Sequence, residues 1–147
     1  MNLLELLQNM SSSVGEKQWE FLMCFRETIK KYGYSYNNEL HQYSTLIWRI
    51  LLDVGSEGYQ NTVIDIIDLL EILGIEKPTE WHDLIIRRYM PYTKEGTEFY
   101  LNLITRETKK FGFLSKEYNK LNHIQFILRC RIESDDYINC LGIFDCN

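Results

Sequence analysis

Apolar residues recur every three or four positions along most of this chain, which is the period of amphipathic helices. The pattern is clearest over residues 38–54, where one face is apolar throughout: Leu40, Tyr43, Ile47, Ile50, Leu51 and Val54. Gly55 follows this stripe as a predicted helix stop. Similar stripes predict further helices over about 16–32, 62–73, 79–90 and 97–111, one starting at the cap residue Ser115, and a short last one starting at the cap residue Ser134.

Two of these segments carry informative details. The helix over 16–32 places Phe21, Cys24, Phe25, Thr28 and Tyr32 at helical spacing, and Leu22 and Ile29 widen this stripe. In the third predicted helix, over 62–73, nearly all the non-acidic residues are aliphatic. Asp65, Asp68 and Glu71 recur every three residues and form one narrow acidic stripe. We therefore expect that helix to be mostly buried.

Six to seven helices joined by short connections predict an all-α fold, a compact globule in which neighbouring helices run antiparallel. The chain has 147 residues, 45% of them hydrophobic and 14% aromatic, which is enough for one core and one domain over residues 1–147. Residues 1–15 are interpreted as a short N-terminal extension containing an amphipathic turn of helix, because Glu5 interrupts its apolar run and no basic segment precedes it.

Charge narrows the classes of partner. The formal net charge is -5, which opposes approach to nucleic acid and to anionic membrane surfaces. Basic residues occur mostly as isolated pairs such as Lys109-Lys110, which we interpret as solvated helix faces. No stretch is long enough to span a bilayer, and the four cysteines show no CxxC pairing, so we expect reduced thiols, a cytoplasmic protein, no nucleic-acid partner and no membrane span.

The sequence offers no grouping typical of catalysis. The three histidines, His41, His82 and His123, stand far apart with no HxxxH or HExxH spacing, and there is no GxSxG elbow or glycine-rich phosphate loop. We therefore expect no catalytic residue, cofactor or metal, and a protein that is not an enzyme. A cysteine nucleophile, Cys24 or Cys130 acting with a histidine, is the enzymatic alternative.

Aromatic residues in connections are candidates for binding another protein. Tyrosines concentrate in the loop 32–36 and in the turn 89–92, where the chain must be exposed. Tyr, Trp and Arg are the residue types that dominate binding hot spots, which selects Tyr34, Tyr36, Arg88 and Tyr92 as candidates. The competing interpretation is that these side chains fasten the loops to the core.

The helix order and several short stretches resemble the intracellular Bcl-2-like proteins of poxviruses. The stretches that carry the resemblance are Tyr43-Ser44-Thr45-Leu46, residues 64–70, residues 85–91, Phe111-Gly112 and the tail 136–147. The absence of alanine also suits an AT-rich viral genome. At the end of the fifth predicted helix the chain has Lys109-Lys110-Phe111-Gly112-Phe113 where cellular Bcl-2 proteins carry Asn-Trp-Gly-Arg.

This resemblance implies a Bcl-2-like fold and a non-enzymatic antagonist of host innate immune signalling of the NF-κB type, or of apoptosis. Its partners would be host signalling or pro-apoptotic proteins in the cytoplasm of the infected cell. The resemblance also implies a possible homodimer through the first and sixth predicted helices, with Trp19 or Met23 and Phe126 or Cys130 in the contact. The alternative is a bacterial or phage immunity or anti-defence protein that blocks a toxin or nuclease through the acidic stripe at Asp65.

Overall fold

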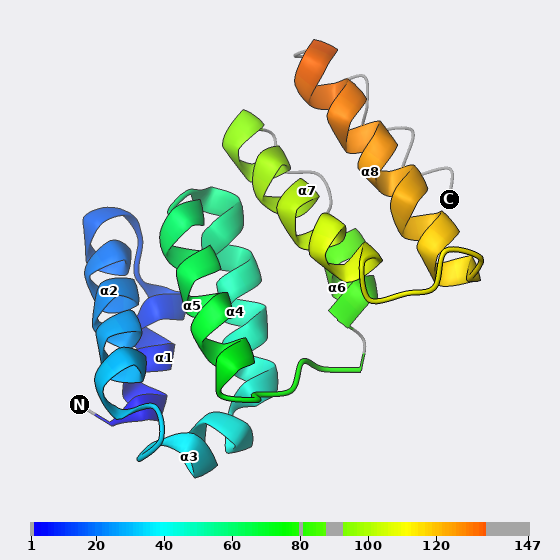
Figure 1. Cartoon of the computed structure of the whole chain (residues 1–147). Coiled ribbons are helices and arrows are strands. Elements are labelled where there is room, and N and C mark those ends of the chain that lie inside the picture. The colour runs from blue at the N-terminus through cyan, green and yellow to red at the C-terminus, as the bar shows by residue number, and fades with distance from the viewer. Residues whose placement is uncertain (1, 80, 88–92, 135–147) are drawn as a thin grey trace. The chain divides into compact units, whose positions relative to one another are not determined.

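The computed structural model describes residues 2–79, 81–87 and 93–134, and this part of the chain is helical with no strand. Its helices are α1 (Leu3–Ser12), α2 (Gly15–Tyr32), α3 (Asn37–Gln42), α4 (Ser44–Glu57), α5 (Gln60–Ile72), α6 (Trp81–Arg87), α7 (Lys94–Thr108) and α8 (Lys116–Ser134) (Figure 1). The all-α prediction is confirmed. The contacts divide the chain into two compact units, residues 1–79 and 80–147. A Bcl-2-like arrangement and a single domain over residues 1–147 stay predictions.

In the first unit four helices close a ring of contacts. Helix α1 packs on α2, α2 on α5, α5 on α4 and α4 back on α1, while the short α3 packs on α4. Connections of only two residues join α1 to α2 and α4 to α5, and short connections of this kind favour packing of the two helices that they join. The ring encloses an apolar core that includes Leu7, Met10, Leu22, Phe25, Leu40, Ile47, Trp48, Leu51, Leu52, Val63 and Ile66.

Helix α1 is a full member of this core and extends beyond the single turn expected for the N-terminal extension. The side chain of Asn2 caps it, because its Oδ1 accepts a hydrogen bond from the Glu5 amide at 2.8 Å. Its buried residues, Leu3, Leu6, Leu7 and Met10, follow the i, i+3, i+4, i+7 spacing of one helix face.

The buried face of α2 agrees with the predicted stripe at Leu22, Phe25 and Ile29 and differs from it elsewhere. It consists of Gln18, Leu22, Phe25 and Ile29, whereas Cys24 is exposed and Tyr32 is 55% exposed. The reason is α1: α2 packs on α1 and on α5, so its buried side is turned toward both. The buried Gln18 side chain donates a hydrogen bond to the Met10 carbonyl at 3.0 Å, which satisfies a polar group in that contact.

The face predicted over 38–54 is buried except at the half-buried Tyr43, and the segment holds two helices. Tyr43, at φ -101 and ψ 15, ends α3 and precedes α4. Gly55 is buried inside α4, which continues to Glu57. The helix ends at Gly58, whose φ of 140 is open to glycine and unfavourable for other residues.

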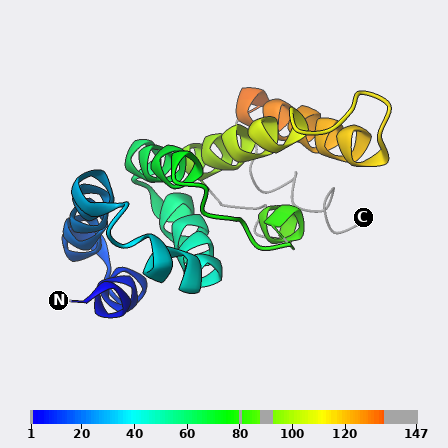
Figure 2. The ribbon, with the colours of Figure 1, turned by 60° about the horizontal axis from the view of Figure 1, so that its bottom comes forward.

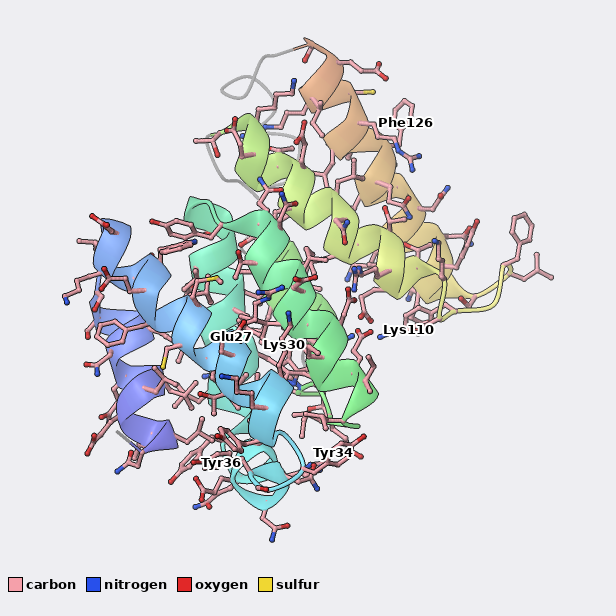
Figure 3. All side chains as sticks on the ribbon, turned by 60° about the vertical axis from the view of Figure 1, so that its left-hand side comes forward. Glu27, Lys30, Tyr34, Tyr36, Lys110 and Phe126 are labelled. Carbon is pink, nitrogen blue, oxygen red and sulfur yellow. The ribbon has the colours of Figure 1, made fainter. Side chains whose placement is uncertain are left out.

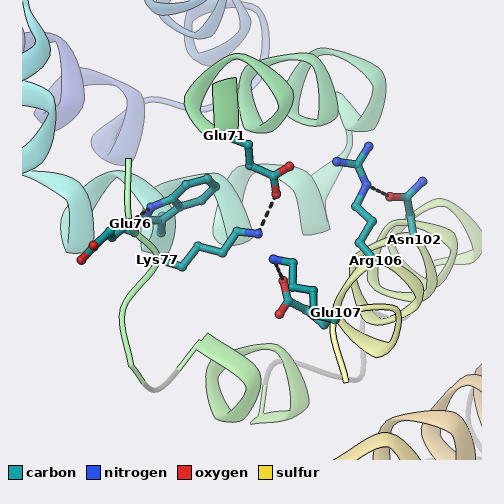
Figure 4. Close-up of polar contacts among 8 residues, drawn as sticks. Glu71, Glu76, Lys77, Asn102, Arg106 and Glu107 are labelled. Atoms are coloured by element: carbon teal, nitrogen blue, oxygen red, sulfur yellow. Dashed lines mark hydrogen bonds and ion pairs between the residues drawn. The ribbon is translucent and has the colours of Figure 1, made fainter. Parts of the chain in front are cut away.

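Helix α5 is amphipathic. It buries Val63, Ile66, Ile67 and Leu70, whereas Ile72 is 76% exposed, so the expectation of a mostly buried helix is only partly met. After α5, the chain returns to α4, where the indole Nε1 of the fully buried Trp48 donates to the Glu76 carbonyl at 2.9 Å. The Lys77 ammonium lies 5.5 Å from the centroid of the same ring and 2.6 Å from Glu71 Oε1 (Figure 4).

The second unit contains a hairpin of α7 and α8, with α6 packed on α7 (Figures 1 and 2). Helix α7 begins at Lys94, earlier than predicted, because Thr93 Oγ1 accepts from the Gly96 amide at 3.1 Å and caps it. The predicted cap of α8 is confirmed, since Ser115 Oγ accepts from the Tyr118 amide at 3.1 Å. The predicted apolar face of α8 is also buried: Leu121, Ile124, Ile127 and Leu128.

A buried polar contact joins the two helices of the hairpin. The Gln125 amide donates to Thr108 Oγ1 at 2.7 Å, and that hydroxyl donates to the Ile104 carbonyl within α7 at 2.7 Å. On the surface of α7, Arg106 Nε donates to Asn102 Oδ1 at 2.8 Å (Figure 4).

In the part of the chain that the structure describes, no helix combines the length and apolar character needed to cross a bilayer.

Candidate protein-binding surface

Five of the seven candidate residues lie in the described part of the chain: Trp19, Met23, Tyr34, Tyr36 and Phe126. The other two, Arg88 and Tyr92, fall outside the described residues. The turn 89–92, the short last helix predicted beyond Ser134, and the cysteines Cys140 and Cys146 also fall outside them.

Three of the candidates lie on or next to one side of α2. Spacings of three or four residues place Trp19, Met23, Glu27, Lys30 and Tyr34 on the same side of the helix and of the turn that continues it. Figure 3 shows Glu27 and Lys30 on the outward side of α2 and Tyr34 beyond its end. We refer to these five residues as the α2 outer face.

The α2 outer face combines the chemistry of a protein contact. Trp19 is 42% exposed and Tyr34 is 86% exposed, so an aromatic side chain is accessible toward each end. The half-buried Met23 lies between them and can adapt its shape to a partner. Glu27 and Lys30 add one charge of each sign, which would orient a charged partner.

The backbone holds the far end of this face in place. Gly33 donates to the Ile29 carbonyl at 2.9 Å, and Tyr36 donates to the Tyr32 carbonyl at 3.0 Å, so the helical turn is continued past the end of α2. Tyr36 itself is half-buried and precedes α3, where its carbonyl accepts from the Leu40 amide at 2.8 Å. Its aromatic ring is thus less accessible than that of Tyr34.

An ion pair borders the α2 outer face and fastens α2 to α5. The Arg26 guanidinium approaches one carboxylate oxygen of Asp65 through two nitrogens, at 2.6 and 3.1 Å. A third nitrogen lies 3.5 Å from Glu27 Oε1. Arg26 therefore lies between Asp65 of α5 and Glu27 of the α2 outer face.

The same contacts change the character of the acidic stripe on α5. Asp65 is paired with Arg26 and Glu71 with Lys77. Asp68 is half-buried. Asp65 and Glu71 therefore each have a cation of the same unit beside them.

The residues implied in a dimer contact are accessible on their own helices. Phe126 is 64% exposed on α8, and Cys130 is exposed one turn further along. Trp19 and Met23 lie on α2 as described above. Trp19, Phe126 and Cys130 are therefore available to a second molecule, Met23 is half-buried, and the dimer itself stays a prediction.

The described residues contain no group of three or more His, Cys, Asp or Glu side chains that could hold a metal ion. His41 and His123 are exposed on α3 and α8. A hollow of about 250 Å³ lies in the first unit, and its lining contains neither His nor Cys: Ser11, Ser13, Val14, Gln18, Ile50, Asp53, Val54 and Ser56.

Phe113 and Leu114 were not among the candidates predicted from sequence, and they are 75% and 89% exposed between α7 and α8. The signal was present in the sequence as two adjacent large apolar residues between Gly112 and a predicted helix cap.

Comparison of the chain with protein-family models, with curated proteins and with solved structures finds no match.

Proposed function

We propose that this chain acts by binding another protein through the α2 outer face, without catalysis of its own. The observation that carries the proposal is the exposure of Trp19 and Tyr34 toward the two ends of one ordered helical surface. Aromatic side chains on rigid backbone lose little conformational freedom on binding, which favours affinity.

The identity of the partner is proposed from the resemblance to poxvirus Bcl-2-like proteins. On that basis the chain antagonises host innate immune signalling of the NF-κB type, or apoptosis, in the cytoplasm of infected cells. The all-helical architecture supports this proposal, as does the accessibility of the positions implied in a dimer contact. Homodimerisation through Trp19 or Met23 and Phe126 or Cys130 is part of the same proposal.

The alternative, an inhibitor of a bacterial toxin or nuclease acting through the acidic stripe, has less support. Asp65 and Glu71 already have cationic partners in their own unit, which would have to be displaced by a basic site. Replacing the three stripe carboxylates with amides tests this alternative directly, because such a variant would lose inhibition of a toxin and keep binding through α2.

The decisive experiment measures partner binding and signalling with matched variants. Trp19→Ala combined with Tyr34→Ala removes both aromatic anchors of the α2 outer face. Leu46→Ala is the control, because Leu46 is 38% exposed on α4, close to the exposure of Trp19. The chain is expressed in mammalian cells carrying an NF-κB reporter, and captured signalling proteins are identified by immunoblot, while death-motif helical peptides are titrated against the purified protein.

We expect the double variant to lose on the order of tenfold or more in affinity for its partner and to release the reporter or cell death from inhibition. The control variant should behave like the unmodified protein. An unmodified chain that inhibits neither pathway refutes the proposed partner class. A double variant with full inhibition refutes the α2 outer face as the contact.

A further inference from the structure

Two large apolar residues form the apex of the connection between α7 and α8. The Ser115 amide donates to the Gly112 carbonyl at 2.9 Å, which closes a turn whose two central residues are Phe113 and Leu114. Central turn positions are usually filled by small or polar residues. Here the two side chains are 75% and 89% exposed, so the fold of the hairpin gains little from them.

The apex is ordered. The Phe113 ring lies 5.4 Å from the Tyr118 ring, centroid to centroid, at an angle of 51°. The Ser115 cap and the first turn of α8 follow immediately. An exposed apolar group in a fixed position binds with less loss of conformational entropy than one on a freely moving loop.

Exposed lysines flank the apex on both sides along the chain. Lys109 follows the end of α7, and Lys116 and Lys120 lie on the first two turns of α8. All three are exposed, and within the described residues no ion pair engages them. Lys110, at the hairpin end of α7 (Figure 3), is paired with Glu107 at 2.9 Å. The positive end of the α8 helix dipole adds to the positive potential of these lysines.

We propose that the α7–α8 apex, defined as Phe113, Leu114 and the flanking Lys109 and Lys116, docks on the surface of an anionic lipid bilayer. A membrane surface is apolar beneath a layer of negative headgroups, which matches an apolar tip flanked by exposed lysines. An apex of two apolar residues is also too small to bury the area of a stable protein–protein contact by itself. This inference is independent of the proposed function, since it concerns a different surface.

The local charge explains how an acidic protein can bind an anionic surface. Residues 107–120 contain four lysines and two glutamates, whereas the chain as a whole carries -5. Charges further from the membrane than about 10 Å are largely screened at physiological salt. The bilayer therefore meets the lysines of the apex and little of the negative charge elsewhere.

The test is flotation of the full chain with vesicles. Vesicles of phosphatidylcholine alone are compared with vesicles that also contain phosphatidylserine, at low and high salt. The apolar variant combines Phe113→Ser with Leu114→Ser, and the charge variant combines Lys109→Glu with Lys116→Glu. Ile72→Ser is the matched control, because Ile72 is 76% exposed on α5, far from the apex in sequence.

We expect the unmodified chain and the control to float with anionic vesicles and to stay behind with neutral ones. The apolar variant should lose on the order of tenfold in partition coefficient. The charge variant should lose binding at low salt, where the unmodified chain binds best. Absence of flotation with anionic vesicles overturns the proposal, as does an apolar variant that floats like the unmodified chain or an equal loss in the control.

A second measurement does not depend on loss of binding. In Phe113→Trp, the added indole should shift its emission to shorter wavelength on anionic vesicles and be quenched by brominated acyl chains, after subtraction of the emission of the unmodified chain. Emission that stays unchanged while the protein floats would place the apex in water and overturn the proposal. If the apex instead inserted into a protein groove, neither vesicle assay would respond.

Discussion

Replacing Gly33 with alanine should destabilise the first unit, although the backbone conformation alone suggests the opposite. Gly33 has φ -53 and ψ -40, which every residue adopts readily, and it continues the helical turn of α2. In such a conformation, exchange of glycine for alanine ordinarily stabilises by about 1 kcal/mol, because alanine loses less entropy on folding.

Steric contact reverses this sign. An ideal Cβ on Gly33 would lie 2.6 Å from the carbonyl oxygen of Ile29 and 2.8 Å from Cδ1 of Leu73. The Leu73 side chain can rotate away, but the Ile29 oxygen belongs to the backbone and accepts the Gly33 amide at 2.9 Å. Overpacking costs about 1–3 kcal/mol and a strained hydrogen bond about 1 kcal/mol more. After the propensity gain is subtracted, we expect a net loss of about 1–3 kcal/mol.

The assay is urea unfolding followed by far-ultraviolet circular dichroism, with Gly112→Ala as the matched control. A Cβ on Gly112 has no atom within 4 Å, so that variant should be as stable as the unmodified chain or slightly more so. Gly33→Ala should lower the midpoint and leave the slope unchanged. A Gly33→Ala variant as stable as Gly112→Ala would refute the close approach of Leu73 and Ile29 to Gly33.

Three further predictions concern the first unit. Trp48→Phe should cost about 2–4 kcal/mol of unfolding free energy, because it leaves a buried carbonyl without its donor and opens a cavity, whereas Trp19→Phe on the surface should change it by less than about 0.5 kcal/mol in the same urea titration. A double-mutant cycle on Arg26 and Asp65 should give a coupling of about 0.2–1 kcal/mol that falls at high salt, since the pair is partly exposed. Residues 1–79 expressed alone should unfold cooperatively by circular dichroism, because the ring of α1, α2, α5 and α4 lies within them; a fragment without helical signal would favour one domain over the full chain.

The presence of the helices and most of their buried faces were predictable from sequence, because each is a local property. The stripe of α4 contains Ile47, Ile50 and Leu51, whose spacing is the same whatever the helix packs against. The Ser115 cap was also predictable, since a hydroxyl before an amphipathic run satisfies amides that the helix leaves free. Such features depend on residues within one or two turns of each other.

Features that depend on a distant partner were missed or displaced. The buried side of α2 is set by α1, so counting Cys24 in its apolar stripe was wrong once Leu7 and Met10 joined the core. The end of α4 at Gly58, and not at Gly55, reflects a left-handed turn that continues with Tyr59 at φ 54. The apolar pattern gives no warning of either.

Among the candidate surface residues, too, some could be predicted from sequence and others could not. Trp19 was selected through the resemblance, as a position of the implied dimer contact, and it is 42% exposed on α2. Tyr34 was found because a glycine-containing loop must be exposed. Phe113 and Leu114 were missed, because a large apolar pair is ordinarily assigned to the core, and only the closed turn between Gly112 and Ser115 shows that the core does not receive them.

The prediction drawn from net charge is the one that the structure changes most. A value of -5 predicts repulsion from an anionic surface only when unpaired charge is spread evenly. Three carboxylates, those of Asp65, Glu71 and Glu107, each have a cationic side chain within 3 Å in their own unit, which lowers the negative potential that a partner meets there. Lys109 and Lys116 have no such counterion within the described residues. Because screening confines each charge to its neighbourhood, the sign that a partner meets depends on which side chains are left outside ion pairs, and that is decided by the fold.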